Sequence, residues 1–287
     1  MGWELLGQVA PRALRGAREQ AHWAAQVIAA TGETFLAHEA DTSHTSLRWD
    51  AAHRALAGRT LPGETVCRVA VRLSDLLLCL LGPGAAPFAE LALPDHSLAE
   101  AYRWTSEAIR AATRGALDRP LVHPGFELPP HALAQGGRFA RDPGLAELAR
   151  WYGNADAALR RLAEQTRGAG PVQCWPHHFD IATLIEVESA QAGGAARTVG
   201  VGLSPGDASI DEPYWYVNHW PATSRRALPV LTSGEWFREG WVGAVLRGGP
   251  LVSAGDAAAQ EGLLRAFLAA AVDANRALAL EAPSPQP

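Results

Sequence analysis

The stretch from residue 171 to residue 188, PVQCWPHHFDIATLIEVE, constrains the fold most, because it combines a strand-like apolar pattern with a cluster of ionisable side chains. In a β-strand, successive side chains alternate between the two faces. Read as one strand, the segment places Phe179 and Ile181 on an apolar face. It places His178 and Asp180 on the opposite face, about 7 Å apart. We therefore expect a half-buried strand whose polar face presents candidate catalytic or metal-binding side chains.

Strand patterns recur on both sides of this segment. Residues 67–73 alternate apolar and polar side chains, and a turn leads from them into the apolar run 76–81. Residues 88–93 are predicted to add a further strand to this meander. Residues 197–203 and 214–220 follow the central segment through glycine-containing turns, so we expect them to pair with it in an antiparallel sheet.

Helical patterns separate these strands. Residues 11–35 carry apolar side chains at helical spacing, and Ser97 and Glu100 form a capping box at the start of a second helix. Asp142 is predicted to cap a third helix, and Asp256 a last one. The sequence therefore predicts an α+β fold of antiparallel sheets with several packed helices. No shift in composition divides the chain, so we expect one domain over residues 1–281 and a disordered tail over 282–287.

The charge balance argues against a nucleic-acid-binding protein. The chain of 287 residues has a formal net charge of −5 and 25 basic residues, all of them arginines that are dispersed along the sequence. A face that binds nucleic acid would concentrate positive charge to match phosphates. We therefore expect no nucleic-acid partner.

No uncharged apolar run approaches the roughly 20 residues of a membrane span, and the amino-terminal residues lack the apolar region of a signal peptide. Cys67, Cys79 and Cys174 show no CxxC spacing and read as buried, unpaired thiols. We expect a soluble, cytoplasmic protein without a membrane partner.

The candidate catalytic residues are His22, His44, His178 and Asp180. A histidine and a carboxylate on one strand face suit a divalent metal ion if other histidines complete the set, although the HHxD pattern fixes neither the metal nor its ligands. A second interpretation makes His178 or His44 a general base oriented by Asp180. A third is structural, with these side chains hydrogen-bonded in a partly buried network.

Aromatic residues gather near these positions and suggest the wall of a small-molecule pocket. The candidate substrate-binding residues are Trp23, Trp49, Trp175, Tyr214, Tyr216 and His219. Filling of the core explains the same residues without a ligand. The chain has no GxGxxG, GxxxxGK[ST] or GxSxG motif, so a dinucleotide site, a P-loop and a hydrolase elbow are not expected.

Two functional hypotheses follow. In the first, the chain is an enzyme or binder that acts on a small molecule in a pocket formed by His22, His44 and Asp180. In the second, it is a non-catalytic interaction protein that forms a homo-oligomer through an exposed aromatic patch. The residues of that patch would be Trp215, Trp220, Trp236 and Trp241.

Five short stretches resemble a bacterial family of uncharacterised proteins, a domain of unknown function. They are AHWAAQVI, HTSLRW, PVQCWPHHFDIA, GLSPGD and EPYWYV, which occur in this order over nearly the whole chain. The resemblance implies a single α+β domain and favours His22, His44 and Asp180 as shared site residues. It implies no reaction.

Overall fold

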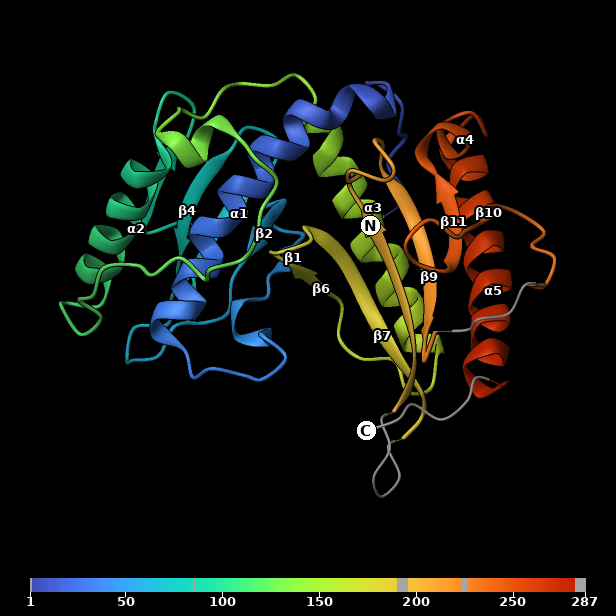
Figure 1. Cartoon of the computed structure of the whole chain (residues 1–287). Coiled ribbons are helices and arrows are strands. Elements are labelled where there is room, and N and C mark those ends of the chain that lie inside the picture. The colour runs from blue at the N-terminus through green and yellow to red at the C-terminus, as the bar shows by residue number, and fades with distance from the viewer. Residues whose placement is uncertain (1, 85, 190–195, 223–226, 282–287) are drawn as a thin grey trace. The chain divides into compact units, whose positions relative to one another are not determined.

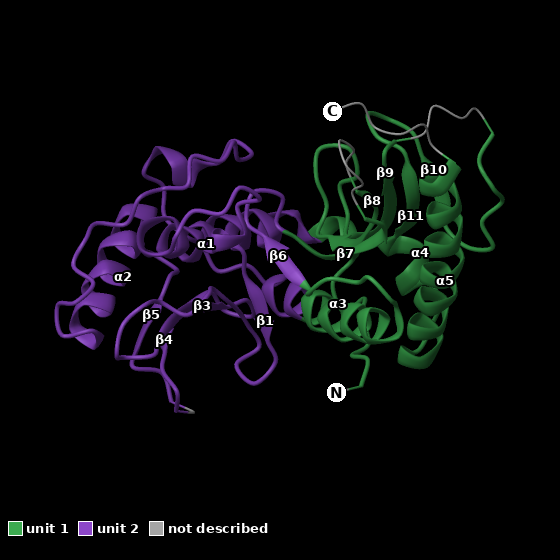
Figure 2. Cartoon of the chain, turned by 90° about the horizontal axis from the view of Figure 1, so that it is seen from below, with its two compact units in different colours: residues 1–13, 150–172, 180–287 green, residues 14–149, 173–179 purple. Residues whose placement is uncertain are grey.

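The computed structural model describes residues 2–84, 86–189, 196–222 and 227–281 (Figure 1). Its helices and antiparallel sheets confirm the predicted α+β class. The chain divides into two compact units (Figure 2). Unit 1 comprises residues 1–13, 150–172 and 180–287, and unit 2 comprises residues 14–149 and 173–179. The single domain over residues 1–281 stays a prediction, and the predicted tail lies outside the described residues.

Unit 2 contains a five-stranded antiparallel sheet in which neighbouring strands follow chain order, as the predicted meander requires. Its strands are β1 (Arg48–Asp50), β2 (Ala55–Ala57), β3 (Arg68–Arg72), β4 (Leu77–Leu81) and β5 (Ala89–Ala92). The short strand β6 (Gln173–Trp175) also belongs to this unit. There Cys174 and Leu47 exchange two backbone hydrogen bonds of 2.8 and 2.9 Å.

Helix α1 (Arg15–Phe35) is the central helix of unit 2 and packs against α2 (Leu98–Ala112) and β3. It continues from a 3₁₀ turn, η1 (Pro11–Leu14). The sequence predicted an amphipathic helix, but every residue from 21 to 32 is buried. Alanine is frequent in this stretch, so neighbouring elements approach closely. The Gln26 amide nitrogen and the Thr31 hydroxyl donate to backbone carbonyls, while Oε1 of Gln26 is buried with no hydrogen-bond partner among the described residues.

Unit 1 contains an antiparallel sheet in the order β10-β11-β9-β8-β7. Its strands are β7 (Asp180–Glu188), β8 (Arg197–Ser204), β9 (Tyr214–Trp220), β10 (Glu235–Phe237) and β11 (Gly243–Arg247). The pairing of β7 with β8, and of β8 with β9, confirms the predicted order. The turn predicted at residues 191–194 lies outside the described residues.

Helix α5 (Ala257–Glu281) packs against β8, β9 and β11 and follows the short helix α4 (Gly248–Val252). The carboxylate of Asp256 accepts a hydrogen bond of 2.9 Å from the Ala259 N–H, which confirms the predicted cap. The apolar side chains at Leu264, Phe267 and Leu268 are buried. Helix α3 (Leu145–Gln165) contributes its residues from 150 onward to unit 1.

The segment from 171 to 188 is not one strand, which corrects the prediction. Strand β6 ends at Trp175, and β7 begins only at Asp180. Between them the Phe179 N–H donates to the Trp175 carbonyl at 2.6 Å, and Phe179 has a left-handed backbone with φ of 55°. Pro176 has no N–H to donate to a ladder, which favours this break. His178 therefore lies in a turn and does not share a strand face with Asp180.

The cap of α2 offers a test of unit 2. The Ser97 hydroxyl accepts from the Glu100 N–H at 3.2 Å, and the Glu100 carboxylate accepts from the Ser97 N–H at 2.7 Å. We expect Ser97→Ala to lower the free energy of unfolding by about 1 kcal/mol in urea titration, because the Glu100 N–H at the start of the helix loses its side-chain acceptor. Ser106→Ala, whose hydroxyl only bonds back to the Tyr102 carbonyl within α2, is the control. Equal stability of the two variants would contradict the capping role.

Candidate functional site

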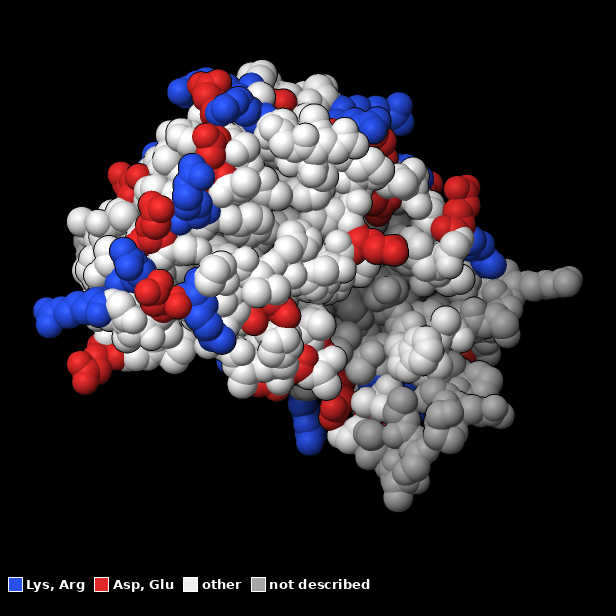
Figure 3. Space-filling view, turned by 60° about the vertical axis from the view of Figure 1, so that its left-hand side comes forward, with Lys and Arg blue, Asp and Glu red and all other residues white. Residues whose placement is uncertain are grey.

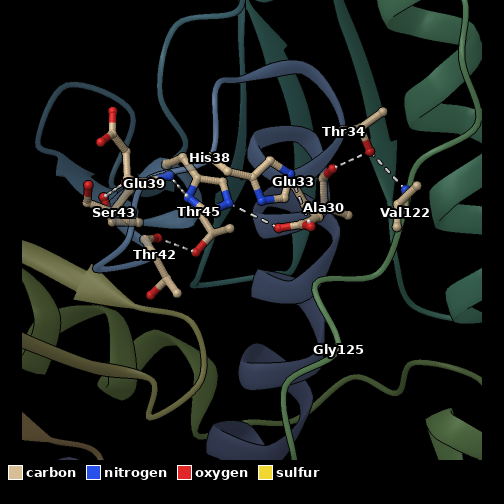
Figure 4. Close-up of polar contacts among 12 residues, drawn as sticks. Ala30, Glu33, Thr34, His38, Glu39, Thr42, Ser43, Thr45, Val122 and Gly125 are labelled. Carbon is tan, nitrogen blue, oxygen red and sulfur yellow. Dashed lines mark hydrogen bonds and ion pairs between the residues drawn. The ribbon is translucent and has the colours of Figure 1, made fainter.

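One group of potential metal ligands lies at the carboxyl end of α1 in unit 2. Glu33 is in the last turn of the helix, which ends at Phe35, and His38 follows in the adjoining loop. His44 lies in the 3₁₀ turn η2 (Ser43–Thr45). Figure 4 shows this cluster, in which the Glu33 carboxylate points toward the loop that carries His38.

The local sequence explains why the loop folds back on the helix. A methyl group at Gly32 would lie 2.2 Å from the carbonyl oxygen of His44, so only glycine allows η2 to approach the helix this closely. Thr42 adopts a left-handed backbone with φ of 59°, and the Asp41 carboxylate accepts from the Ser43 N–H at 2.9 Å. These turns return the chain to α1 within one short loop.

The Glu33 carboxylate lies between two imidazoles. Its Oε2 is 3.1 Å from Nε2 of His44, and its Oε1 is 3.5 Å from Nε2 of His38. One atom from each of the three residues can be chosen so that all lie within 4.8 Å of one another. The side chain of His44 is 4% exposed, that of Glu33 20% and that of His38 67%, so the cluster opens to solvent on the His38 side.

A backbone hydrogen bond fixes the proton on His44. The Glu39 N–H donates to Nδ1 at 3.2 Å, so the neutral ring carries its hydrogen on Nε2. That N–H points at the Glu33 carboxylate, which accepts it. The ion-free cluster is thus a hydrogen-bonded pair with a second, exposed imidazole beside it.

His22 does not belong to this cluster, which corrects the predicted pocket of His22, His44 and Asp180. His22 precedes Glu33 by eleven residues on α1, and a helix rises by about 1.5 Å per residue, so the two positions are about 16 Å apart along the axis. Asp180 belongs to unit 1, whereas both histidines belong to unit 2. His22 and His44 therefore do not line one pocket within unit 2.

The histidines of the PHHFD segment gather with His22 in unit 2. Nε2 of His22 donates to the Pro176 carbonyl at 2.8 Å, and the His22 ring stacks on Phe179 with centroids 5.1 Å apart. The rings of His177 and His178 have centroids 4.4 Å apart. Burial lowers the pKa of His22 to about 4, assisted by the positive fields of Arg18, His178 and His177.

Burial likewise lowers the pKa of His177 to about 4, with a further contribution from His178. Its Nδ1 is buried and has no hydrogen-bond partner among the described residues. The half-buried ring of Trp175 lies edge-on to it at 6.0 Å. His22 and His177 are therefore neutral at pH 7.

Asp180 has a specific partner in unit 1. Its Oδ2 accepts a hydrogen bond from the Tyr216 hydroxyl. Tyr216 reaches it because Gly202 lies opposite on β8, where a methyl group would come within 2.6 Å of that hydroxyl. Asp180 is 9% exposed, so this contact satisfies one oxygen of a buried carboxylate.

The predicted aromatic wall is divided between the two faces of β9. Side chains alternate along the strand, so Tyr214 and Tyr216 share one face and His219 lies on the other. His219 donates from Nδ1 to the Asn275 side chain of α5 at 2.7 Å. The sequence predicted that these three residues line a common pocket, but they do not share one face of the strand.

The tryptophans are mostly structural. Trp23 and Trp49 are buried in unit 2, at 7% and 6% exposure. Trp215 of the predicted oligomer patch is fully buried, and Trp220 lies on the opposite face of β9. A patch that contains both cannot form on one face of the strand, although homo-oligomerisation itself stays a prediction.

The SPGD motif forms a turn. Asp207 accepts from the N–H groups of Ser209 and Ile210 at 2.7 and 3.0 Å and from the Tyr214 hydroxyl at 2.5 Å. Burial raises the pKa of Tyr214, and the bond to Asp207 raises it further. The motif therefore closes the connection from β8 to β9.

The chain matches no protein-family model, no curated protein and no solved structure. The resemblance to an uncharacterised bacterial family stays a prediction. Among the described residues, none of the helices has the length and apolar character needed to span a membrane. Acidic and basic side chains are interspersed on the face that Figure 3 shows.

Glu33 and its relation to His38 were missed at the sequence level. The spacing Glu-x4-His-x5-His, placed where a helix gives way to a loop, is the signal that could have indicated the cluster. Cys67, Cys79 and Cys174 are buried and form no disulfide bond among the described residues, as predicted. Burial raises the pKa of Cys67 and Cys79, which makes both poor nucleophiles.

The Asp180 contact gives a stability prediction for unit 1. We expect Asp180→Asn to lower the free energy of unfolding by about 1–3 kcal/mol, because the Tyr216 hydroxyl loses a charged acceptor. The measurement is urea unfolding followed by circular dichroism. Asp273→Asn, on the exposed side of α5, is the matched control and should change stability by less than about 0.5 kcal/mol. Wild-type stability of Asp180→Asn would show that the contact is not structural.

The His22 environment gives a pH prediction. The pKa of His22 is about 4 in the folded chain and 6.5 for the unperturbed side chain, so below pH 6.5 only the unfolded chain takes up this proton. The free energy of unfolding should therefore fall as the pH drops from 6.5 toward 4, by about 2 kcal/mol between pH 7 and pH 5 for this residue. His22→Gln should lose correspondingly less stability over that interval.

Unfolding midpoints in urea at pH 7 and pH 5 give this difference directly. His131→Gln removes an imidazole outside the cluster and should retain the wild-type pH dependence. The same acid sensitivity in His22→Gln as in the wild type would refute the assignment.

Proposed function

We propose that this chain binds a divalent transition-metal ion through Glu33, His38 and His44 and uses it on a small molecule. The proposal rests on one observation, that an oxygen and two imidazole nitrogens from these residues converge within 4.8 Å in unit 2. Imidazole and carboxylate are the ligands that zinc and its neighbours prefer when no thiolate is present. This metal site replaces the HHxD segment that the sequence favoured.

The distances suit a tetrahedral ion. With ligand bonds of about 2.1 Å, a tetrahedral centre separates its ligand atoms by about 3.4 Å. The oxygen–nitrogen separations, 3.1 Å from Oε2 to His44 and 3.5 Å from Oε1 to His38, are close to that value, although they involve the two different oxygens of the carboxylate. Small side-chain adjustments would therefore bring the ligands onto an ion.

Three protein ligands leave a fourth position open. The exposed His38 side faces solvent, so water or a substrate atom can reach that position. A divalent ion with an open position lowers the pKa of bound water and polarises a carbonyl or phosphoryl oxygen. The proposal is thus a metal-dependent activity on a small molecule, with hydrolysis as the first reaction class to examine.

Metal binding would change the hydrogen bonds of His44. To hold an ion through Nε2, the neutral His44 ring would have to carry its hydrogen on Nδ1 instead. Nδ1 can then no longer accept from the Glu39 N–H, whose bond is long at 3.2 Å. The loop at residue 39 should therefore shift on loading, which hydrogen exchange at the Glu39 amide would report.

The test is elemental analysis and equilibrium dialysis of the untagged protein with Zn²⁺. We expect about one ion per chain, with binding weakened by more than about tenfold in His38→Ala. The His38 side chain is 67% exposed, so its removal should leave the fold intact. Zinc should also raise the thermal midpoint of the wild type and not of His38→Ala.

The matched control is His178→Ala, which removes an exposed histidine from the segment that the sequence favoured. It should retain the ion. Loss of the ion from His178→Ala, with retention in His38→Ala, would return the metal to the HHxD segment. Absence of stoichiometric zinc, iron or manganese in the wild type would reject both metal sites.

A further inference from the structure

A cavity of about 430 Å³ lies beside the end of α1 in unit 2 and is lined by three arginines. Arg48, Arg59 and Arg68 contribute to its wall together with Glu39 and Thr60, while Leu36 supplies an apolar part. The volume lies within the range of small-molecule sites. This cavity is separate from the cluster of Glu33, His38 and His44, none of which lines it.

Strand register explains why two of the arginines face the same space. Arg48 on β1 is opposite Ala57 on β2, and Ala57 is opposite Ala70 on β3. Arg68 lies two residues before Ala70, so it shares its face of the sheet. Arg48 and Arg68 therefore point to the same side of the sheet, where both line the cavity.

The positive charge in this cavity is only partly neutralised. Arg68 forms an ion pair of 2.5 Å with Asp50. Within the described parts of the chain, the guanidinium groups of Arg48 and Arg59 have no carboxylate partner. Glu39 is the one acidic residue in the cavity wall. Like charges held near one another repel, so an anion placed between them would be stabilised.

We propose that this cavity binds a small organic anion through a phosphate or carboxylate group. Guanidinium groups recognise both through paired N–H donors in a fixed plane. The Thr60 hydroxyl offers a further donor, and Leu36 contacts the uncharged part of the ligand. The Glu39 carboxylate selects for a ligand that also carries a hydroxyl or ammonium group, since it would repel a second anionic group.

This inference does not depend on the metal site, so its test uses protein treated with EDTA and then desalted. Isothermal titration with inorganic phosphate and, separately, with glycolate, which carries one carboxylate and one hydroxyl, at constant ionic strength distinguishes the two anion types. We expect saturable binding of at least one of them to the wild type. The double variant Arg48→Ala/Arg59→Ala should weaken it by at least about tenfold, and both side chains are exposed, so the fold should persist.

Two further variants make the test specific. Arg103→Ala removes an exposed arginine of α2 outside the cavity and should bind as the wild type does. Glu39→Gln should bind the anion more tightly, because it removes the one negative charge of the cavity wall. No saturable binding of either anion up to roughly 10 mM, or equal weakening in Arg103→Ala and in the double variant, would overturn the proposal.

Discussion

The burial of helix α1 determines the positions of the candidate site residues in unit 2. Residues 21–32 are all buried, so the helix cannot rotate without exposing apolar surface or breaking the hydrogen bond from the Gln26 amide to the Pro176 carbonyl. It therefore fixes His22 near its middle and Glu33 at its end. The close approach of η2 at Gly32 then brings His44 to Glu33. Both histidine clusters follow from the position of one rigid helix.

In the sheet of unit 1, a glycine leaves the space for the contact that holds the candidate site residue. Glycine at position 202 leaves space over β8, and the ring of Tyr216 occupies it to reach Asp180. Asp207 accepts hydrogen bonds from the turn that precedes β9 and from the Tyr214 hydroxyl. Tyr214 lies on the same face of β9 as Tyr216. The acidic and tyrosine side chains that looked chemically capable in the sequence are thus paired with one another. Their hydrogen bonds stabilise the sheet in the ligand-free chain.

Two local imbalances of charge in unit 2 lie near the end of α1. The exposed imidazole of His38 faces a carboxylate that already accepts from His44. The neighbouring cavity holds arginine side chains in excess of acidic ones. A cation and an anion would each relieve a different local imbalance of charge. The two proposals can fail separately, because they rest on different side chains.

The sequence by itself determined the α+β class, the order of the antiparallel strands and the caps at Ser97 and Asp256. These features depend on local periodicity and on hydrogen bonds between residues close in the chain, which a sequence displays directly. Only the tertiary structure decided which histidines meet. The turn at Phe179 separates His178 from the strand face of Asp180, and the length of α1 separates His22 from His44. Such proximities depend on where elements pack, and spacing along the chain does not encode them.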